Sequence, residues 1–392
     1  MKEQNMTESV YIVESARSPI GTFLGSLSSY TPIDLGTHVA KAVIERSGAP
    51  ADAFDASVFA NVVTSRPRDV YTPRAVALQA GLPQGSHAYA VNRLCGSGVQ
   101  AIVSAAQQMV TGDSSLALVG GTEVMSAAPY SIPGMRKGIK MGDGTLDDWL
   151  TGALTDPMGN GIMGITAENI AERYGISRER QDEYALESQR RARAAIEEGR
   201  FADQIVPVPV RGGEFTIDEH PRETSLDKLG ALRPTFRKDG TVTAGNSSGI
   251  NDAAAVTVMA SQAAVDEHGL NPQARVVSWG IAGCDPKYMG LGPVQAVPKA
   301  LKKAGLSLGD IDLIESNEAF AAQCLAVSDQ LGFDPDKTNV DGGAIALGHP
   351  IGATGVILTT KLIARLRATG GRYGLVTLCI GGGQGIALIL EV

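Results

Sequence analysis

The sequence predicts a layered α/β fold built from two similar halves, with a long insertion in the first half. Three observations support this prediction. Strands and helices alternate along most of the chain, their order in the first 121 residues returns after residue 275, and the 47 glycines cluster where strands meet helices. Such clusters indicate places where the backbone turns tightly or approaches another segment closely. A chain of 392 residues is long enough for two or three domains with a large core.

The first half contains a regular series of short apolar runs and longer helical segments. In order, these are strand 10–13, helix 32–47, strand 58–62, strand 88–91, helix 99–110 and strand 116–119. Asn61 lies near the end of its strand, and the strand at 88–91 leads into the turn Cys95-Gly-Ser-Gly98. The last strand ends at Gly120-Gly121.

The second half repeats this order. Its elements are strand 275–279, helix 294–304, strand 311–315, the segment 339–343, helix 356–366, strand 374–378 and strand 385–390. The last of these strands has its counterpart at 253–259, which returns to the first half after the insertion. Asn61 lies 34 residues before Cys95 and Asn317 lies 32 residues before His349, so the spacing supports an internal repeat.

The insertion differs in character from the two halves. It has a loop region rich in proline, glycine and methionine at 129–164, a charged helical segment at 167–199 with Ser177 as an N-cap, and a stretch with several basic residues at 211–238. We therefore expect three units. They are residues 1–121 with 244–274, the inserted loop domain 122–243, and the second half 275–392.

Alternating strands and helices predict a largely parallel sheet in each half, and such sheets need helices on both faces. Two stacked units would bury helices between their sheets. The helix at 97–110 is rich in alanine, glycine and serine, which suits that central position. The expected architecture is a duplicated α/β/α/β/α arrangement of layers.

Composition excludes several classes of protein. Lys and Arg total 34 against 42 Asp and Glu, so an acidic chain without basic blocks predicts no binding to nucleic acid or anionic membrane. No apolar run approaches the roughly 20 residues that span a bilayer. The amino-terminal stretch is polar, without a signal-peptide core, and the chain ends without a retrieval tripeptide. The four cysteines form no C-x-x-C pair, so they predict neither a disulfide framework nor a metal site. We therefore expect a cytoplasmic location.

Both halves place a reactive residue type at the same turn between a strand and a helix. Cys95 occupies the turn in the first half and His349 in the second. Such a turn presents free N–H groups and the positive end of the helix dipole. These groups lower a thiol pKa from about 8.5 and can stabilise an oxyanion.

Two further polar residues end apolar strands. Cys379 precedes the run Gly381-Gly382-Gly383, and Asn317 is followed by Glu318. A lone cysteine is more often a small buried hydrophobe than a nucleophile, and we expect that of Cys284 and Cys324. The glycine runs do not indicate a dinucleotide site. Gly381–Gly385 has no helix or downstream acid after it, and Cys95-Gly-Ser-Gly98 lacks the third glycine at the right spacing.

With these four residues in view, the whole chain resembles the thiolases, which are acetyl-CoA acetyltransferases and 3-ketoacyl-CoA thiolases. Four segments carry the resemblance: Val91-Asn-Arg-Leu-Cys95-Gly-Ser-Gly98, Asn317-Glu-Ala-Phe-Ala321, Gly342-Gly-Ala-Ile-Ala-Leu-Gly-His349-Pro and Cys379-Ile-Gly-Gly-Gly-Gln-Gly385. Their order and spacing are similar to the family pattern, and most similar to bacterial β-ketothiolases of the biosynthetic type.

The resemblance implies a reaction in two stages. Cys95 attacks an acyl-CoA thioester while His349 takes its proton, and the N–H groups of Cys95 and Gly381 hold the oxyanion. Cys379 then removes the α-proton of a second acyl-CoA, or returns a proton in thiolysis. His349 and a water held by Asn317 stabilise the enolate.

The resemblance also implies binding residues in and near the insertion. The segment Ala244-Gly-Asn-Ser-Ser248 is similar to the lining of the pantetheine channel, and Arg222 matches a contact of the CoA nucleotide. The basic residues that could add positive potential are Arg211, Lys228, Arg233 and Arg237. Met163, Met289 and Phe320 correspond to acyl-binding positions. CoA and acyl-CoA are substrates, and no cofactor or metal is expected.

Two positions depart from many relatives. Asp341 stands where they carry Asn, and Ile162 stands where some carry His. The first change could alter the local field or form a turn, and the second bears on acyl preference. The family is usually tetrameric or dimeric, and we expect a homotetramer with the loop 131–144 as a contact.

Three alternatives remain open at this stage. A ketoacyl synthase of the same superfold lacks the second cysteine. A non-catalytic acyl-CoA or lipid carrier would not need Cys95 and His349 intact. A thiol-redox protein would form a disulfide between Cys95 and Cys379 in preference to acylation.

Overall fold

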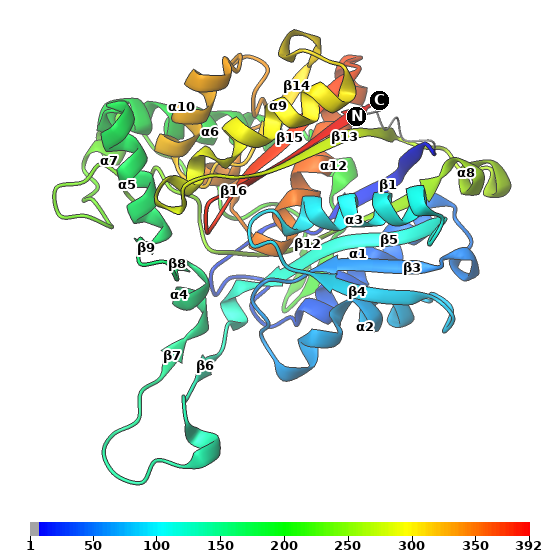
Figure 1. Cartoon of the computed structure of the whole chain (residues 1–392), viewed down its shortest axis with the longest axis horizontal. Coiled ribbons are helices and arrows are strands. Elements are labelled where there is room, and N and C mark those ends of the chain that lie inside the picture. Colours follow the sequence, from blue (N-terminus) through cyan, green and yellow to red (C-terminus); the bar gives the residue numbers. More distant parts are fainter. Residues whose placement is uncertain (1–7) are drawn as a thin grey trace.

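Two sheet halves with helices between them form the body of the molecule in the computed structural model, which describes residues 8–392 (Figure 1). Most of the polar amino-terminal stretch therefore lies outside the described residues. The strands of the first half are β1 (Val10–Arg17), β2 (Gly21–Thr22), β3 (Ala56–Ala60), β4 (His87–Val91), β5 (Leu116–Val124) and β12 (Asn251–Ser261). Those of the second half are β13 (Ala274–Gly283), β14 (Leu313–Ser316), β15 (Tyr373–Ile380) and β16 (Gln384–Glu391).

The strand order confirms the internal repeat. The sheet runs β14-β15-β16-β13-β1-β12-β5-β3-β4, so β13-β16-β15-β14 and β1-β12-β5-β3 are the same series on either side of one junction. The two halves join at their first strands, where Tyr11 pairs with Arg275 and Ile12 with Ala274. The strand predicted at 385–390 is indeed the counterpart of the one at 253–259.

The expectation of largely parallel sheets was wrong, because each half is mixed. β3 runs parallel to β4 and β5, and β14 runs parallel to β15, whereas β12 and β16 are antiparallel to both of their neighbours. β15 and β16 are joined by a tight hairpin at Gly382 and Gly383, whose φ values are 78° and 81°. A parallel pair needs a long crossover, which this turn does not provide. The insertion between β5 and β12 likewise allows an antiparallel return.

The central layer consists of α3 (Ser97–Thr111) and α12 (Ile351–Thr369), as the small residues of the first helix predicted. α3 contacts β3 and β5 as well as β16 of the other half, and α12 contacts β5, β12, β14 and β15. The helices meet at Gly98 and Gly355. A Cβ at Gly355 would lie 2.3 Å from the backbone nitrogen of Val99, so a side chain there cannot fit.

Other helices cover the outer faces of the sheets. α1 (Pro32–Ser47) and α2 (Thr72–Gln79) pack on the first half, and α9 (Gly292–Ala304) packs on the second. The remaining helices of these halves are α8 (Gln262–His268), α10 (Ala321–Leu331) and α11 (Ala344–Leu347). Together with the central helices they complete the five layers that the sequence predicted.

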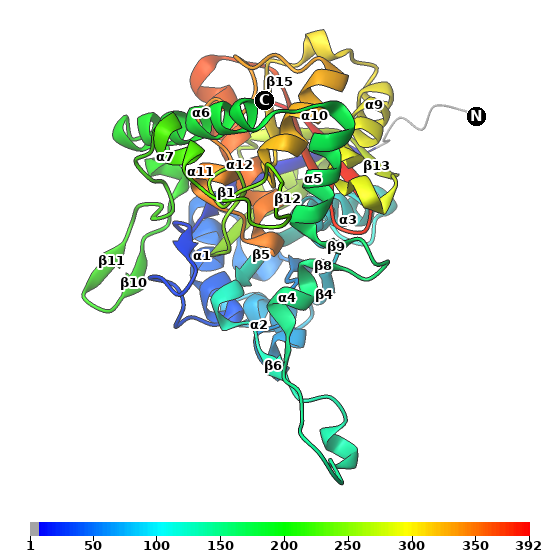
Figure 2. The same cartoon turned by 90° about the vertical axis from the view of Figure 1, so that its left-hand side faces the viewer.

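Two parts of the insertion project from the body of the molecule (Figures 1 and 2). Its helices are α4 (Trp149–Ala153), α5 (Met163–Tyr174), α6 (Arg178–Glu197) and α7 (Leu226–Gly230), and its strand pairs are β6 (Tyr130–Ser131) with β7 (Asp147–Asp148), β8 (Thr155–Asp156) with β9 (Gly161–Ile162), and β10 (Val208–Val210) with β11 (Gly213–Phe215). Ser177 caps α6, because its side chain accepts a hydrogen bond from the backbone of Arg180.

Residues 130–148, here called the arm, project from the body (Figure 2). The predicted domain boundaries near 122 and 243 stay predictions. β5 continues to Val124 and β12 begins at Asn251. Within residues 8–392, no helix is both long enough and apolar enough to cross a bilayer.

Candidate active site

The turn that carries Cys95 is held rigidly in front of α3. Leu94 has a φ of 47°, which is unusual for a residue with a side chain, and its N–H donates to Asn92 Oδ1 at 3.0 Å. Ser97 Oγ accepts from the N–H of Arg93 at 2.8 Å and donates to the carbonyl of Leu94 at 2.6 Å. These local bonds fix the strained turn and present the thiol of Cys95 at the start of the helix.

Burial raises the pKa of the Cys95 thiol above its usual range, although the N–H groups of Gly381 and of Cys95 itself, which point at the sulfur, lower it. The negative charge of Glu123 raises it further. The prediction that the turn lowers this pKa was therefore wrong for the free protein, because desolvation outweighs the N–H donors. A thiol of this kind needs a base to become a nucleophile.

His349 is held in one orientation and one tautomer. Its backbone N–H donates to Asn251 Oδ1 at 3.0 Å, and its Nδ1 lies 2.7 Å from Thr354 Oγ1. The single hydroxyl proton of Thr354 is donated to the carbonyl of Pro350, so the Thr354 oxygen accepts from Nδ1–H. The proton is thereby assigned to Nδ1, and Nε2 carries the free electron pair of a base.

The imidazole of His349 is also neutral at physiological pH. Burial lowers its pKa to about 4, and the residue is only 6% exposed. Among residues 8–392, no hydrogen-bond partner contacts the buried Nε2. A buried nitrogen without a partner costs free energy, so this atom is suited to receive a proton from a group that enters the site.

Asn317 follows β14, and its backbone N–H donates to the carbonyl of Thr377 at 2.9 Å. Its side-chain Oδ1 and Nδ2 are both buried, and neither has a partner in the part of the chain that the structure describes. Side-chain amides in protein interiors are normally paired. The orphaned amide therefore indicates that a polar group or a water binds here.

Glu318, which the sequence reasoning missed, holds the loop before His349 in place. Its carboxylate accepts from Ser188 Oγ at 2.6 Å, from Asn339 Nδ2 at 2.9 Å and from the N–H of Ile345 at 3.2 Å. Ser188 belongs to α6, so this carboxylate joins the insertion to the second half. The sequence did contain one indication of this role, because Glu318 directly follows the predicted site residue Asn317.

Cys379 lies at the end of β15 in a small apolar cluster. Met289 and Phe320 pack around it, with Met163 at the partly buried edge. Burial raises the pKa of the Cys379 thiol well above its usual range, and the nearby thiols of Cys95 and Cys284 raise it further. The structure thus brings together four residues that the sequence places up to 216 positions apart, from Met163 to Cys379.

Gly381 lies between this cluster and the turn of Cys95. A Cβ at Gly381 would lie 3.3 Å from both Met163 Sδ and Leu94 Cδ1. The absence of a side chain leaves the N–H of Gly381 free to point at the Cys95 sulfur. Two thiols, two N–H donors and apolar walls therefore meet at one place.

The residues predicted to contact CoA lie nearer the surface. Ala244 and Arg222 are exposed, and the N–H of Ser248 donates to the carbonyl of Ala319 at 3.0 Å. His220, two residues before Arg222, packs so tightly on Gly249 that a Cβ there would lie 2.3 Å from its ring. The segments of Arg222 and Ser248 are therefore neighbours.

The other basic residues of the insertion divide into two groups. Arg211, Lys228 and Arg233 are exposed. Arg237 is already paired, since its guanidinium lies 3.1 Å from Glu172 and 2.8 Å from Asn169 Oδ1. Arg237 is thus the weakest of these candidates for a phosphate contact.

Asp341 has a structural environment. It is buried, and its carboxylate pairs with Arg200 at 2.6 Å and with Arg365 at 3.7 Å. A buried carboxylate needs such partners to offset its desolvation. These arginines balance its charge. The second departure, Ile162, is partly buried and is followed in sequence by Met163.

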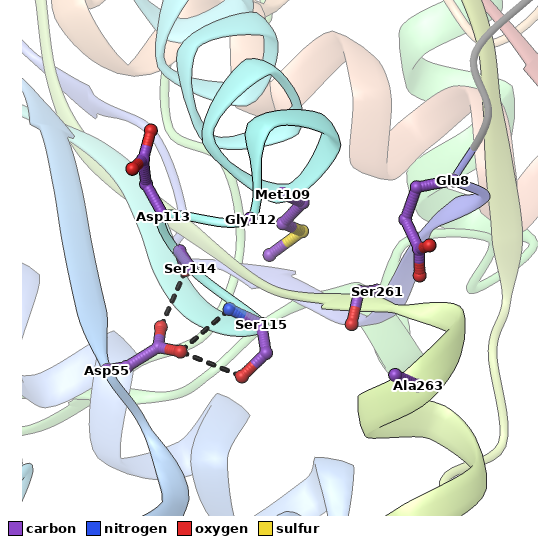
Figure 3. A pocket seen from close by; sticks show the side chains of 9 residues that line it. All are labelled: Glu8, Asp55, Met109, Gly112, Asp113, Ser114, Ser115, Ser261 and Ala263. Carbon is purple, nitrogen blue, oxygen red and sulfur yellow. Dashed lines mark hydrogen bonds between the residues drawn. The ribbon is translucent and has the colours of Figure 1, made fainter.

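A separate surface pocket at the other end of α3 holds none of the predicted site residues (Figure 3). Its Asp55 accepts from Ser114 Oγ at 2.6 Å and from the N–H and Oγ of Ser115 at 2.7 and 2.8 Å. This carboxylate is occupied in joining two loops.

Comparison with known proteins agrees with this geometry. Residues 10–263 match the family described as "Thiolase, N-terminal domain", and residues 270–392 match "Thiolase, C-terminal domain". The chain is 52% identical over 392 residues to the beta-ketothiolase BktB of Cupriavidus necator, covering 98% of this chain and 100% of that one. It is 48% identical to the mitochondrial 3-ketoacyl-CoA thiolase of Rattus norvegicus, covering 97% of this chain and 98% of that one.

Solved structures give the same result. The crystal structure of human mitochondrial 3-ketoacyl-CoA thiolase in complex with CoA matches with a TM-score of 0.97 and 46% identity, covering 98% of each chain. The acetyl-CoA acetyltransferase of Bacillus anthracis matches with a TM-score of 0.95 and 46% identity, again covering 98% of each chain.

The buried neutral imidazole makes stability depend on pH. Because the pKa of His349 is about 4 when folded and about 6.5 when unfolded, its contribution is complete above pH 6.5 and is lost as the pH falls toward 4. Between pH 7 and pH 4 we expect the unfolding free energy of His349→Gln to fall less than that of the wild type, by about 3 kcal/mol. Urea unfolding measures this difference, and equal losses would contradict the assignment.

Proposed function

The chain belongs to the thiolase family of acyltransferases, and on that premise we propose that it forms and cleaves 3-ketoacyl-CoA through an acyl group carried on Cys95. One observation carries the proposal. The sulfur of Cys95 faces the N–H of Gly381 and lies close to a second thiol, Cys379, at the end of a neighbouring strand. A carrier protein would need neither the paired thiols nor the N–H donors.

The first step is acyl transfer to Cys95. The thiol gives its proton to Nε2 of His349 and the sulfur attacks the thioester carbonyl. The oxyanion accepts hydrogen bonds from the N–H groups of Cys95 and Gly381, and a donor of this kind typically contributes about 10²–10³ in rate. The intermediate collapses with loss of the CoA thiolate, which takes the proton from His349.

The second step uses Cys379. In condensation the Cys379 thiol first gives its proton to Nε2 of His349, and the resulting thiolate removes the α-proton of a second acyl-CoA. The enolate carbon then attacks the acyl group on Cys95, whose sulfur takes the proton back from His349 and leaves as the thiol. His349 and a water held by Asn317 stabilise the enolate oxygen. In thiolysis the same groups act in reverse, with Cys379 protonating the departing acyl-CoA. A positioned base typically supplies about 10²–10⁴ in rate.

We assign the substrate contacts from the same arrangement. Met163, Met289 and Phe320 form the walls for the acyl group, and the cluster that they share with Cys379 supports this. Arg222, Ser248 and Ala244 contact CoA, a role supported by the proximity of their segments and by the CoA bound to the human relative. CoA and acyl-CoA are substrates here, and the mechanism assigns no step to a cofactor or metal.

We also propose a location and an assembly. A cytoplasmic location is supported by the four cysteines, all of which are free thiols. A homotetramer is supported by the arm, in which every residue from 132 to 147 is exposed. Among residues 132–147, the exposed large apolar side chains are Ile132, Met135, Ile139, Met141 and Leu146. Exposed apolar groups of this number favour burial against another subunit.

The function is tested by the loss of 3-ketoacyl-CoA absorbance on addition of CoA, across substrates of four to ten carbons. We expect cleavage of four-carbon and longer chains, because Met163 and Met289 are unbranched side chains that adapt their shape to different ligands. Cleavage confined to four carbons would contradict the broad acyl pocket. No cleavage at any length would contradict the function itself and favour an acyl-CoA carrier.

The two thiols have separable roles, and single substitutions distinguish them. Cys95→Ser should lose acyl-enzyme formation, since a serine hydroxyl is far less nucleophilic at neutral pH. Cys379→Ala should still become acylated at Cys95 but lose condensation by at least about 10²-fold. Mass spectrometry of the acylated protein and a condensation assay measure the two effects. Normal condensation by Cys379→Ala would rule out its role as the base, and Cys324→Ala is the matched control.

The arm determines the assembly if the tetramer proposal is correct. We expect the wild type to sediment as a tetramer and a Met141→Asp, Leu146→Asp double variant to sediment as a dimer, because burying the new charges is costly. Leu78→Asp, an exposed apolar residue on α2, is the control and should remain tetrameric. A dimeric wild type would refute the tetramer.

A further inference from the structure

Glu123, at the end of β5, is a fully buried carboxylate for which the reaction described above has no role. Its Oε1 accepts from Asn61 Nδ2 at 2.9 Å and from the N–H of Val63 at 3.0 Å. Its Oε2 accepts from the N–H groups of Val62 at 3.1 Å and Gly352 at 2.8 Å. Burial raises the pKa of this carboxyl group to about 7, whereas the N–H groups of Val62, Val63 and Gly352 lower it, so Glu123 is ionised above neutral pH and then only accepts hydrogen bonds.

One of these four bonds crosses from the first half of the molecule to the second. Gly352 is the second residue of α12, and the N-cap of that helix, Pro350, offers no side-chain hydrogen bond. The first N–H groups of a helix need partners from outside the helix, and a negative charge there is favoured by the helix dipole. Glu123 therefore caps α12 from the opposite half.

The capped turn is the one that holds the base. His349 lies two residues before α12, and Thr354, which fixes the ring of His349, lies in the first turn of that helix. On the other side, Val62 packs in the same small cluster as Cys95. The carboxylate of Glu123 thus joins the surroundings of the nucleophile to the helix that carries the base.

The internal repeat shows which residue of the second half corresponds to Glu123. Gly121 of β5 and Thr377 of β15 hold equivalent places, because each pairs with the residue before the asparagine that ends the neighbouring parallel strand. Two residues farther along, β5 has Glu123 and β15 has Cys379. The same position supplies the second thiol in one half and a buried carboxylate in the other.

We propose that Glu123 is a positioning residue, whose carboxyl group accepts the N–H of Gly352 in α12 and so keeps His349 placed to deprotonate Cys95. The inference rests on the roles proposed above for Cys95 and His349. In the first half, the asparagine and the residue equivalent to Cys379 bond to each other and to the backbone. In the second half, the amide of Asn317 is left without a partner for chemistry.

The charge of Glu123 gives the proposal a readout that altered folding would not produce. Cys95 is faced by Glu123 and Cys379, and Glu123 is faced by Asp252 of β12. Removing the charge of Glu123 favours the Cys95 thiolate, whereas displacing His349 slows acylation. A variant without the charge should therefore have a more readily ionised thiol and yet react more slowly with the thioester.

The test compares Glu123→Gln with the wild type. We expect the rate of Cys95 acylation by acetyl-CoA to fall at least ten-fold, and the pH at which iodoacetamide alkylation is half-maximal to shift downward. Glu123→Asp keeps the charge but is one methylene shorter, so it should acylate slowly without that shift. Asp252→Asn removes a buried carboxylate that bonds the N–H of Ser126 and makes no bond to α12. It should acylate within two-fold of the wild type.

Each result decides between the two proposals. A wild type that forms no acyl-enzyme would overturn the proposed function itself. A wild type that acylates, together with a Glu123→Gln variant that acylates equally fast, would overturn only the role of Glu123. If Glu123→Gln does not fold, Glu123→Asp decides, because wild-type acylation by that variant would also contradict the positioning role.

Discussion

The contact between α3 and α12 is the constraint on which the rest of the molecule depends. The two helices touch backbone to backbone at Gly98 and Gly355, in the layer between the sheet halves. Cys95 and His349 each lie two residues before one of these helices, so the packing of one pair of helices places both residues. Protein interiors are close-packed and do not yield gradually. A change at this contact would therefore move the nucleophile relative to its base.

Burial determines the protonation of the free site. It raises the pKa of both thiols, Cys95 and Cys379, and lowers that of His349 to about 4, so all three are neutral at physiological pH. The reacting groups therefore exchange protons with one another and with the substrate. Buried carboxylates instead hold the structure, as Glu318 does by accepting hydrogen bonds from Tyr184, Ser188, Asn339 and the N–H of Ile345.

The sequence predicted much of this arrangement and was wrong where distant segments determine the outcome. The repeat, the five layers and the central small-residue helix were correct, because spacing and side-chain size are local properties. The predicted direction of β12 and β16 was wrong, because strand direction depends on where the connections bring the chain back to the sheet. The predicted direction of the Cys95 pKa shift was also wrong, because the turn supplies the N–H donors that lower the pKa, but the surrounding halves supply the desolvation that raises it.

The sequence by itself determined which residue types stand at the strand ends and glycine turns, and through their spacing it determined the family. Only the tertiary structure decided what those residues face. Met163, Met289 and Phe320 gather around Cys379, and Glu123 reaches a helix 229 residues farther along the chain. The periodicity of a sequence shows which face of a helix or strand is buried. Contacts between residues this far apart in the sequence form only when separate elements pack together. The unpaired amide of Asn317 became visible for the same reason, because an orphaned group can be recognised only when its neighbours are known.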